Sequence, residues 1–129
     1  MILIHELSHV YSPGTVFEKK ALDHVDLKIE DGEILGIIGH TGSGKSTLIQ
    51  HLNGLLKPTE GAVYFNGEDI HDKDFSMKKL RSKIGLVFQY PEHQLFESTV
   101  IEDVQFGPKN MGLDPLEMEM RSFEALKQV

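Results

Sequence analysis

The chain of 129 residues has no cysteine, and it also lacks a long hydrophobic run. Without cysteine it forms neither disulfide bonds nor thiolate sites, which fits a protein of the cytosol. No apolar stretch approaches the roughly 20 residues that a membrane-spanning helix needs. The first residues, Met1–Glu6, lack the basic segment and apolar stretch of a secretion signal. Length and composition favour a single ordinary globular unit.

Basic residues are also few, since 13 lysines and arginines stand against 20 aspartates and glutamates, for a net charge of −7. Non-specific binding to nucleic acid needs a basic surface that displaces counterions from phosphates. The sequence therefore predicts no nucleic-acid partner. Direct adsorption to anionic lipid is disfavoured for the same reason, so we expect any membrane association to run through a protein partner.

Several segments have the patterns of regular structure. Two alternate between apolar and polar side chains, as half-buried strands do: residues 2–10 and 22–30. Two are almost wholly apolar, which predicts strands buried on both faces of a parallel sheet: residues 33–38 and 84–88. A further strand, 61–65, leads into Asn66-Gly67, a pair typical of tight hairpins. Helices are predicted at 45–56, at 77–82, at 100–106 with a stop at Gly107-Pro108, and from Pro115 to Val129 with no stop signal.

The residues Gly39-His-Thr-Gly-Ser-Gly-Lys-Ser46 match the phosphate-loop pattern G-x-x-x-x-G-K-[ST] in full. The glycines let the backbone wrap a triphosphate, with N–H groups at the start of the following helix pointing at the phosphates. Lys45 supplies a cation for the β- and γ-phosphates, and Ser46 a hydroxyl for Mg²⁺. A strand pattern before the loop and a helix pattern after it argue against a chance match. The loop predicts a bound nucleoside triphosphate, but kinases, GTPases and transport ATPases share it.

Three further features narrow the family. Tyr11 ends the first predicted strand, Gln89 ends the apolar segment 84–88, and a distinctive block runs from Phe88 through Phe96 to Pro108. Together with the phosphate loop and Lys57-Pro-Thr-Glu-Gly61, they resemble the nucleotide-binding subunits of ATP-binding-cassette (ABC) transporters. The stretch Tyr11–Glu18 is similar to the ATPase subunits of energy-coupling-factor (ECF) transporters, which take up vitamins and metal ions in prokaryotes. The resemblance extends over essentially the whole chain.

This resemblance implies an α/β fold, the ABC ATPase core of the P-loop NTPases, with an antiparallel β-subdomain. It also implies truncation before the rest of the helical subdomain and the downstream strands. Residues 1–129 would be part of one nucleotide-binding domain with four parts. These are strands of the β-subdomain and core in 1–38, the phosphate loop and its helix in 39–56, a hairpin and a strand to the glutamine loop (Q-loop) in 57–89, and the Q-loop region with the start of the helical subdomain in 90–129.

The resemblance also assigns site residues. Tyr11 would stack on adenine, although an aromatic at a strand end can also simply cover the core. Gln89 would be the catalytic residue that contacts Mg²⁺ or the attacking water, since its amide both accepts and donates, although it can also be an ordinary polar residue. The predicted ATP ligands are Tyr11, Gly39, His40, Thr41, Gly42, Ser43, Gly44, Lys45, Ser46 and Thr47. The predicted Mg²⁺ ligands are Ser46 and Gln89.

Residues 90–108 mix apolar and acidic side chains. In the family this region receives a helix of the transmembrane coupling subunit, and such a surface would suit a basic amphipathic helix. Alternatively, the apolar residues pack internally and the acids face solvent. The resemblance adds a second ATPase subunit, identical or homologous, and indirectly a substrate-binding membrane subunit. It places the protein at the cytoplasmic face of the cell membrane, peripherally attached.

Some family motifs do not occur in these residues. They are the Leu-Ser-Gly-Gly-Gln signature, the apolar strand ending in Asp with a catalytic Glu, and the switch His. The family has them further along the chain, so the sequence resembles the amino-terminal portion of a longer subunit. We therefore expect ATP hydrolysis by the parent subunit but negligible turnover by these 129 residues alone. Apolar surface and an unpaired sheet edge should also be exposed.

Two other functions stay open. A GTPase or small-molecule kinase uses the same loop, but the Asn-Lys-x-Asp and Asp-x-x-Gly motifs of GTPases are absent. A non-enzymatic module could bind nucleotide and hold a partner through residues 90–108. The seven histidines have no metal-ligand context, so we interpret them as surface or structural residues.

Overall fold

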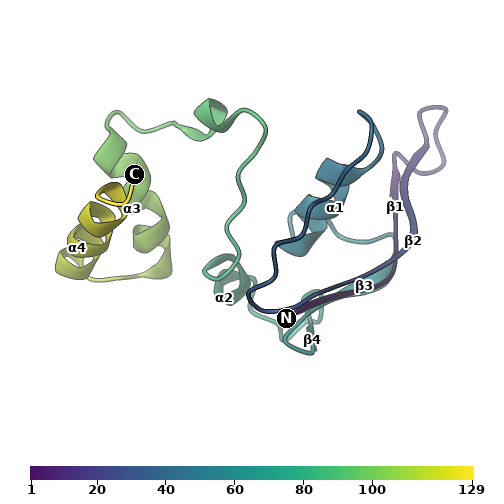
Figure 1. The fold of residues 1–129 in the computed structure, drawn as a ribbon, viewed down its shortest axis with the longest axis horizontal. Helices are drawn as coiled ribbons and strands as arrows, with labels where there is room; N and C mark the ends of the chain where they lie inside the picture. Colours follow the sequence, from purple (N-terminus) through teal and green to yellow (C-terminus); the bar gives the residue numbers. More distant parts are fainter. The chain divides into compact units, whose positions relative to one another are not determined.

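A four-stranded antiparallel sheet organises the first part of the chain in the computed structural model, which describes all 129 residues (Figure 1). Its strands are β1 (Ile2–Tyr11), β2 (Lys19–Ile29), β3 (Glu60–Phe65) and β4 (Glu68–Asp69), in the order β2-β1-β3-β4. The strands predicted from alternation are confirmed, and β2 begins three residues earlier than expected. This sheet belongs to a compact unit, Met1–Gly85, and residues Leu86–Val129 form a second one.

The hairpin between β3 and β4 turns at Asn66-Gly67, as the sequence predicts. Asn66 has φ 52° and Gly67 φ 88°, so both central residues of the turn have positive φ. Such a turn matches the right-handed twist of the two strands, and asparagine and glycine adopt it most easily.

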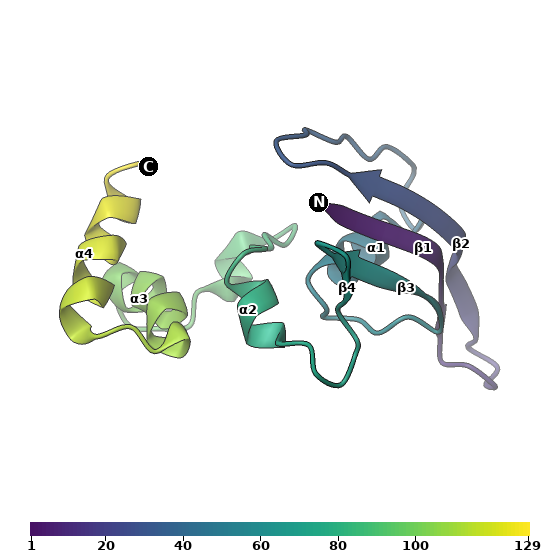
Figure 2. The same ribbon diagram turned by 90° about the horizontal axis from the view of Figure 1, so that it is seen from below.

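Two helices close the core of the first unit. Helix α1 (Lys45–Leu52) lies behind β1 and β3 in Figure 2 and contributes Leu48. Helix α2 (Met77–Arg81) contributes the fully buried Leu80. The remaining buried apolar side chains come from the strands and from the residue after β4: Ile4, Leu7, Leu22, Val63 and Ile70. Burying such side chains is the main source of stability for a unit of this size.

Helix α1 ends four residues before the predicted end at residue 56. Gly54 follows its C-cap, Asn53, and has φ 67°, a left-handed conformation that terminates helices. The N–H groups of Leu55 and Leu56 then both donate to the carbonyl of Gln50, which closes the end of the helix. An Asn-Gly pair therefore outweighs the apolar spacing that favoured a longer helix.

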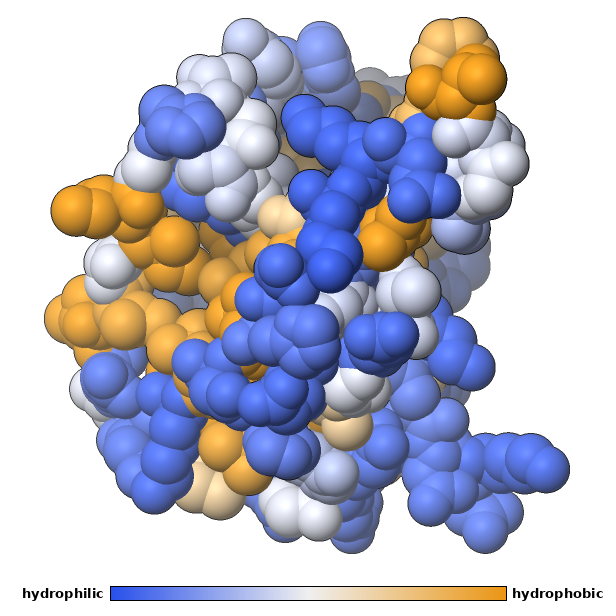
Figure 3. Space-filling view, turned by 90° about the vertical axis from the view of Figure 1, so that its right-hand side faces the viewer, coloured by the Kyte–Doolittle hydropathy of each residue, from blue (hydrophilic) through white to orange (hydrophobic).

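The predictions of buried strands at 33–38 and 84–88 are wrong for this structure. Neither segment is a strand, and the exposed fractions are 98% at Ile34, 95% at Ile38 and 78% at Val87. A parallel strand has no hydrogen-bond partners of its own, so it forms only where neighbouring strands supply a ladder. No other strand of the chain pairs with these segments. As the sequence predicts, apolar surface is exposed, and hydrophobic side chains reach the surface beside hydrophilic ones in Figure 3.

The second unit is helical, with a short 3₁₀ helix η1 (Pro91–Gln94) followed by α3 (Val100–Met111) and α4 (Pro115–Leu126). Thr99 caps α3, since its hydroxyl accepts from the Glu102 N–H while donating to the Glu102 carboxylate at 2.7 Å. Asp114 caps α4 by accepting from the N–H groups of Leu116 and Glu117.

The predicted stop of α3 at Gly107-Pro108 is wrong, because the helix continues through both residues to Met111. Pro108 lacks one N–H donor, and the helix accommodates this loss. It ends instead at Gly112, whose φ of 81° makes a left-handed cap with its N–H donating to Lys109. The helix predicted from Pro115 ends at Leu126 rather than at Val129.

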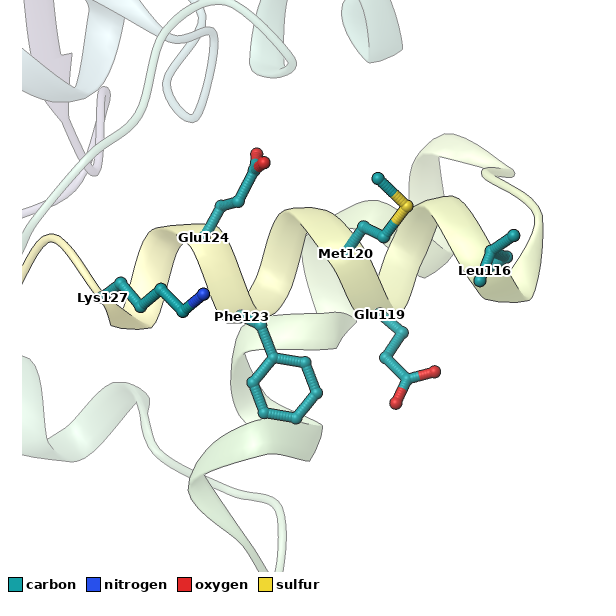
Figure 4. A pocket seen from close by; sticks show the side chains of 6 residues that line it. All are labelled: Leu116, Glu119, Met120, Phe123, Glu124 and Lys127. Atoms are coloured by element: carbon teal, nitrogen blue, oxygen red, sulfur yellow. The ribbon is translucent and has the colours of Figure 1, made fainter.

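Helix α4 carries a row of exposed apolar side chains on one face. Leu116, Met120 and Phe123 repeat at helical spacing and line a shallow pocket together with Glu119, Glu124 and Lys127. Figure 4 shows that five of these side chains come from this one helix and the sixth, Lys127, from its C-cap. No helix of the structure combines the length and the apolar character needed to cross a membrane.

Candidate functional site

The phosphate loop leads directly into α1, and Gly44 is the N-cap of that helix. Gly44 has φ 91°, and a Cβ at this position would lie only 2.5 Å from the carbonyl oxygen of Ala21 on β2. A side chain at position 44 would therefore collide with the backbone of β2, which explains why this residue is glycine. No side chain caps α1, and its first turn holds no acidic residue. The N–H groups and the positive end of the helix dipole stay available for an anion.

Lys45 folds back across the loop. Its Nζ donates to the carbonyls of Gly39 at 2.7 Å and His40 at 2.8 Å, and it lies 3.4 Å from the hydroxyl of Ser43. The Ser43 N–H donates in turn to the carbonyl of His40 at 3.2 Å, so the loop closes on itself around the ammonium. The positive charge is held at the loop, where a triphosphate needs it.

Ser46 and Thr47 follow Lys45 on α1 but face different surroundings. Ser46 is exposed, and its hydroxyl is an oxygen ligand of the kind that Mg²⁺ accepts, so it fits the predicted metal contact. Thr47 is buried, and its Oγ1 lies 3.2 Å from the hydroxyl of Tyr11. His40 and Thr41 are exposed, and His40 Nδ1 contacts the Thr41 carbonyl at 2.9 Å. No group of three or more His, Cys, Asp or Glu residues could hold a metal ion.

Tyr11 is the last residue of β1, and its side chain is 38% exposed. The ring is outside the buried core, so it leaves an aromatic face available to a ligand. Its position is set from two sides, by the hydrogen bond to Thr47 and by the edge-on ring of His9 with centroids 4.6 Å apart. The tertiary structure thus connects Tyr11 to the helix that follows the phosphate loop.

A pair of buried histidines supports this arrangement, and the sequence analysis missed it. His51 is completely buried on α1, with Nδ1 2.7 Å from the Thr47 carbonyl and Nε2 3.2 Å from His9 Nδ1. Since a carbonyl only accepts, Nδ1 of His51 carries the proton and Nε2 accepts from His9. Burial lowers the pKa of His51, which keeps it neutral. The available signal was spacing, since Thr47 and His51 share a helix face and His9 and Tyr11 share a strand face.

Gln89, the predicted catalytic residue, lies in the second unit. It occupies an exposed bend just before η1, because the strand expected to end at this residue does not form. The structure brings the other predicted site residues together in the first unit: Tyr11 and the loop residues Gly39, His40, Thr41, Gly42, Ser43, Gly44, Lys45, Ser46 and Thr47. Gln89 is outside this group.

The segment 90–108 forms an apolar pocket of about 570 Å³ within the second unit, lined by His93, Gln94, Leu95, Phe96, Asp103, Val104 and Phe106. Phe96 and Phe106 pack edge to face with centroids 4.8 Å apart, yet 61% and 44% of their surfaces remain exposed. Asp103 accepts from the N–H groups of Phe96 and Glu97, both at 3.2 Å, and so holds the loop against α3. The apolar residues of this segment are therefore only partly packed internally.

Comparison with known proteins agrees with this geometry. Residues 22–129 match the protein family described as ABC transporter. The chain belongs to the ABC transporter family. It is 57% identical over 128 residues to the energy-coupling factor transporter ATP-binding protein EcfA2 of Clostridium acetobutylicum, and 58% identical over 128 residues to EcfA2 of Symbiobacterium thermophilum. These alignments cover 99% of the chain but 45% and 44% of the relatives, so the chain spans less than half of their length.

Solved ABC structures show the same fold. The chain is 43% identical to cbiO1 from Clostridium perfringens, part of the ABC transporter complex cbiONQ, with a TM-score of 0.76 over 98% of this chain and 49% of that one. A dimeric post-hydrolysis state of the ATP-binding cassette MJ0796, bound to ADP and Pi, gives 34% identity and a TM-score of 0.83 over 98% of this chain and 56% of that one. The α/β fold of an ABC ATPase with an antiparallel sheet is therefore confirmed, in the partial form that the sequence predicts.

Proposed function

We propose that this chain is the nucleotide-binding part of an ECF-type transporter ATPase, which couples ATP binding and hydrolysis to uptake of vitamins or metal ions. The observation that carries the proposal is the phosphate loop closed around Lys45 at the uncapped start of α1. The names of the EcfA2 relatives support the transporter class. Transport substrates are bound by other subunits in such a system, so the parent ATPase subunit supplies the energy and not the selectivity.

In this proposal the nucleotide binds along the surface between Tyr11 and the loop. Tyr11 stacks on adenine, and the N–H groups of the loop residues 39–47 bind the phosphates. Lys45 leaves the carbonyls of Gly39 and His40 to contact the β- and γ-phosphates, exchanging neutral acceptors for charged ones. Hydrogen bonds to charged groups contribute about 1.5–3 kcal/mol each, so a few of them give tight binding.

Ser46 would hold Mg²⁺, which neutralises charge on the phosphate oxygens. A contact of Gln89 with the same ion stays a prediction from the family resemblance alone. Gln89 has both an acceptor oxygen and a donor nitrogen, so it can orient the attacking water from the same side chain. In this proposal hydrolysis also needs a carboxylate that positions water and a second subunit that completes the site. The solved relative bound to ADP and Pi is dimeric, which supports the need for a second subunit. We therefore assign turnover to the parent subunit as a dimer, and negligible turnover to these 129 residues alone.

The pocket of residues 93–106 is the proposed docking site for a helix of a transmembrane coupling subunit. Leu95, Phe96 and Phe106 provide exposed apolar surface, and Asp103 lines the same pocket. An apolar surface with acidic neighbours suits an amphipathic helix with basic flanks. Through this contact the protein would be attached to the cytoplasmic face of the membrane, with the substrate-binding subunit reached only indirectly.

Isothermal titration of MgATP tests the central claim. We expect Lys45→Ala to lower ATP affinity at least about tenfold, because it removes a charge-assisted phosphate contact. Lys73→Ala, at an exposed lysine of the same unit, is the control and should bind like the wild type. Equal affinity of the wild type and Lys45→Ala would overturn the assignment of the loop. Mg²⁺-dependent hydrolysis by the 129-residue chain at the rate of full-length relatives would overturn the assignment of turnover to the dimer.

A further inference from the structure

A second lysine lies at the phosphate loop, and it comes from the sheet rather than from α1. Lys19 is the first residue of β2, and in the antiparallel register it is the direct partner of Tyr11 on β1. A Cβ at Gly42 would have Lys19 Nζ as its nearest neighbour, at 3.9 Å. The ammonium of Lys19 therefore stands over the glycine at the middle of the loop. The strand partner of Lys19 is Tyr11, the aromatic residue at the edge of the same site.

The ammonium group of Lys19 forms no ion pair within the chain. The ammonium groups that do form ion pairs are those of Met1, Lys20 and Lys28. The next residue, Lys20, differs from Lys19 in both respects. Its Nζ lies 3.0 Å from Asp23 Oδ1, and its strand partner is Val10. Successive residues of a strand point to opposite faces of the sheet. The lysine that faces the loop is thus the one whose charge remains unpaired.

We propose that Lys19 is a second phosphate-binding cation, which contacts the nucleotide on the side of the nucleoside while Lys45 contacts the terminal phosphates. This inference rests on the proposed function, since it requires that the loop binds a nucleotide. Lys19 is the strand partner of Tyr11, and its ammonium lies beside Gly42 of the loop. The flexible stem of a lysine at a strand start can adjust its ammonium to the phosphates at little cost to the fold.

The chemical reason is charge balance. The loop itself offers one ammonium and a set of backbone N–H groups, whereas a triphosphate carries several negative charges. The protein as a whole has a net charge of −7, so a local surplus of cations is needed to attract such a ligand. Lys19 adds a positive charge beside the loop, and no acidic side chain of the chain forms an ion pair with it. The phosphates nearest the nucleoside occur in both ATP and ADP, so both ligands should depend on Lys19.

The test is titration of MgATP and MgADP into the 129-residue chain and four variants: Lys19→Gln, Lys19→Arg, Lys20→Gln and Lys45→Ala. We expect Lys19→Gln to weaken both ligands about three- to tenfold, as for a charge contact at an exposed site. Lys19→Arg should restore affinity to within about twofold, because it keeps the charge. Lys20→Gln should bind both ligands like the wild type. Circular dichroism of each variant checks that the sheet is retained.

The outcomes separate this inference from the proposed function. If Lys45→Ala loses ATP affinity while Lys19→Gln binds both ligands like the wild type, the role of Lys19 is refuted and the loop assignment stands. An equal loss in Lys19→Gln and Lys20→Gln also refutes it, since the effect would then be one of net charge. Failure of Lys19→Arg to restore binding would attribute the loss to side-chain shape and overturn the charge contact. If the wild type binds no nucleotide, the proposed function and this inference fall together.

Discussion

His51 Nε2 on the phosphate-loop helix lies 3.2 Å from His9 Nδ1 on β1, in the buried interior. This contact joins α1 to β1. His51 also contacts the Thr47 carbonyl, and the ring of His9 packs against the ring of Tyr11. A neutral His51 satisfies both of its ring nitrogens, one by donating and one by accepting. Protonation of His51 would make Nε2 a donor, so the contact would persist only if His9 Nδ1 gave up its own proton. Tyr11 is thus connected through His9 to a buried, neutral histidine.

Stability should fall as the pH is lowered below about 6.5, the ordinary pKa of histidine. Burial lowers the pKa of His51 in the folded state, so the unfolded chain binds its proton first. The contribution is complete above the unfolded pKa and is lost as pH falls toward the folded pKa. Each unit by which the folded pKa lies below the unfolded one corresponds to about 1.4 kcal/mol. Urea unfolding between pH 5 and 8 measures this slope.

The groups that face His51 are His9 on β1, His71 after β4, and the backbone carbonyl of Lys57. Burial lowers the pKa of His71 as well, so part of the slope comes from that residue. His51→Gln should remove its own part of the slope. His93→Gln, at an exposed position of the second unit, is the control and should leave it unchanged. Identical slopes in the wild type and His51→Gln would contradict the prediction.

Tyr11→Ala should weaken ATP binding by about 1–3 kcal/mol, the usual contribution of one aromatic stacked on a base. Tyr11→Phe keeps the ring and loses only the hydrogen bond to Thr47, so its affinity should stay within about threefold of the wild type. Inorganic tripolyphosphate has no base, and its binding should be the same in all three proteins. The stacking assignment would be wrong if Tyr11→Ala bound ATP as tightly as the wild type.

Phe106→Ala should weaken docking of an amphipathic partner helix about tenfold, because one buried aromatic face is lost from the pocket. The probe is a synthetic helical peptide with leucines on one face and lysines on the flanks, measured by fluorescence anisotropy. Phe123→Ala is the matched control, since Phe123 is similarly exposed, at 49% against 44%, but lies on α4 outside this pocket. An equal loss in both variants would show that the peptide binds exposed phenylalanines in general and not this pocket.

Much of the fold followed from local pattern. The alternating segments became β1 and β2, and Asn66-Gly67 became the predicted turn, because residue alternation and turn chemistry act within a few residues. The prediction of two apolar strands was wrong for the opposite reason. Residues 33–38 have the composition of a buried parallel strand, but a strand of that kind depends on partners distant in the sequence. Helix ends were missed where a single glycine conformation outweighed spacing, as at Gly54 and Gly112.

The sequence alone determined the phosphate loop, since Gly39–Ser46 are contiguous and their function depends on backbone geometry that the glycines permit. Only the tertiary structure showed what surrounds the loop. Thr47 contacts Tyr11 across a sequence separation of 36 residues, and His51 contacts His9 across 42. Lys19 on β2 lies beside Gly42 of the loop. These contacts exist because antiparallel pairing of β1 and β2 and packing of α1 on the sheet bring distant residues together, and no local pattern encodes that proximity.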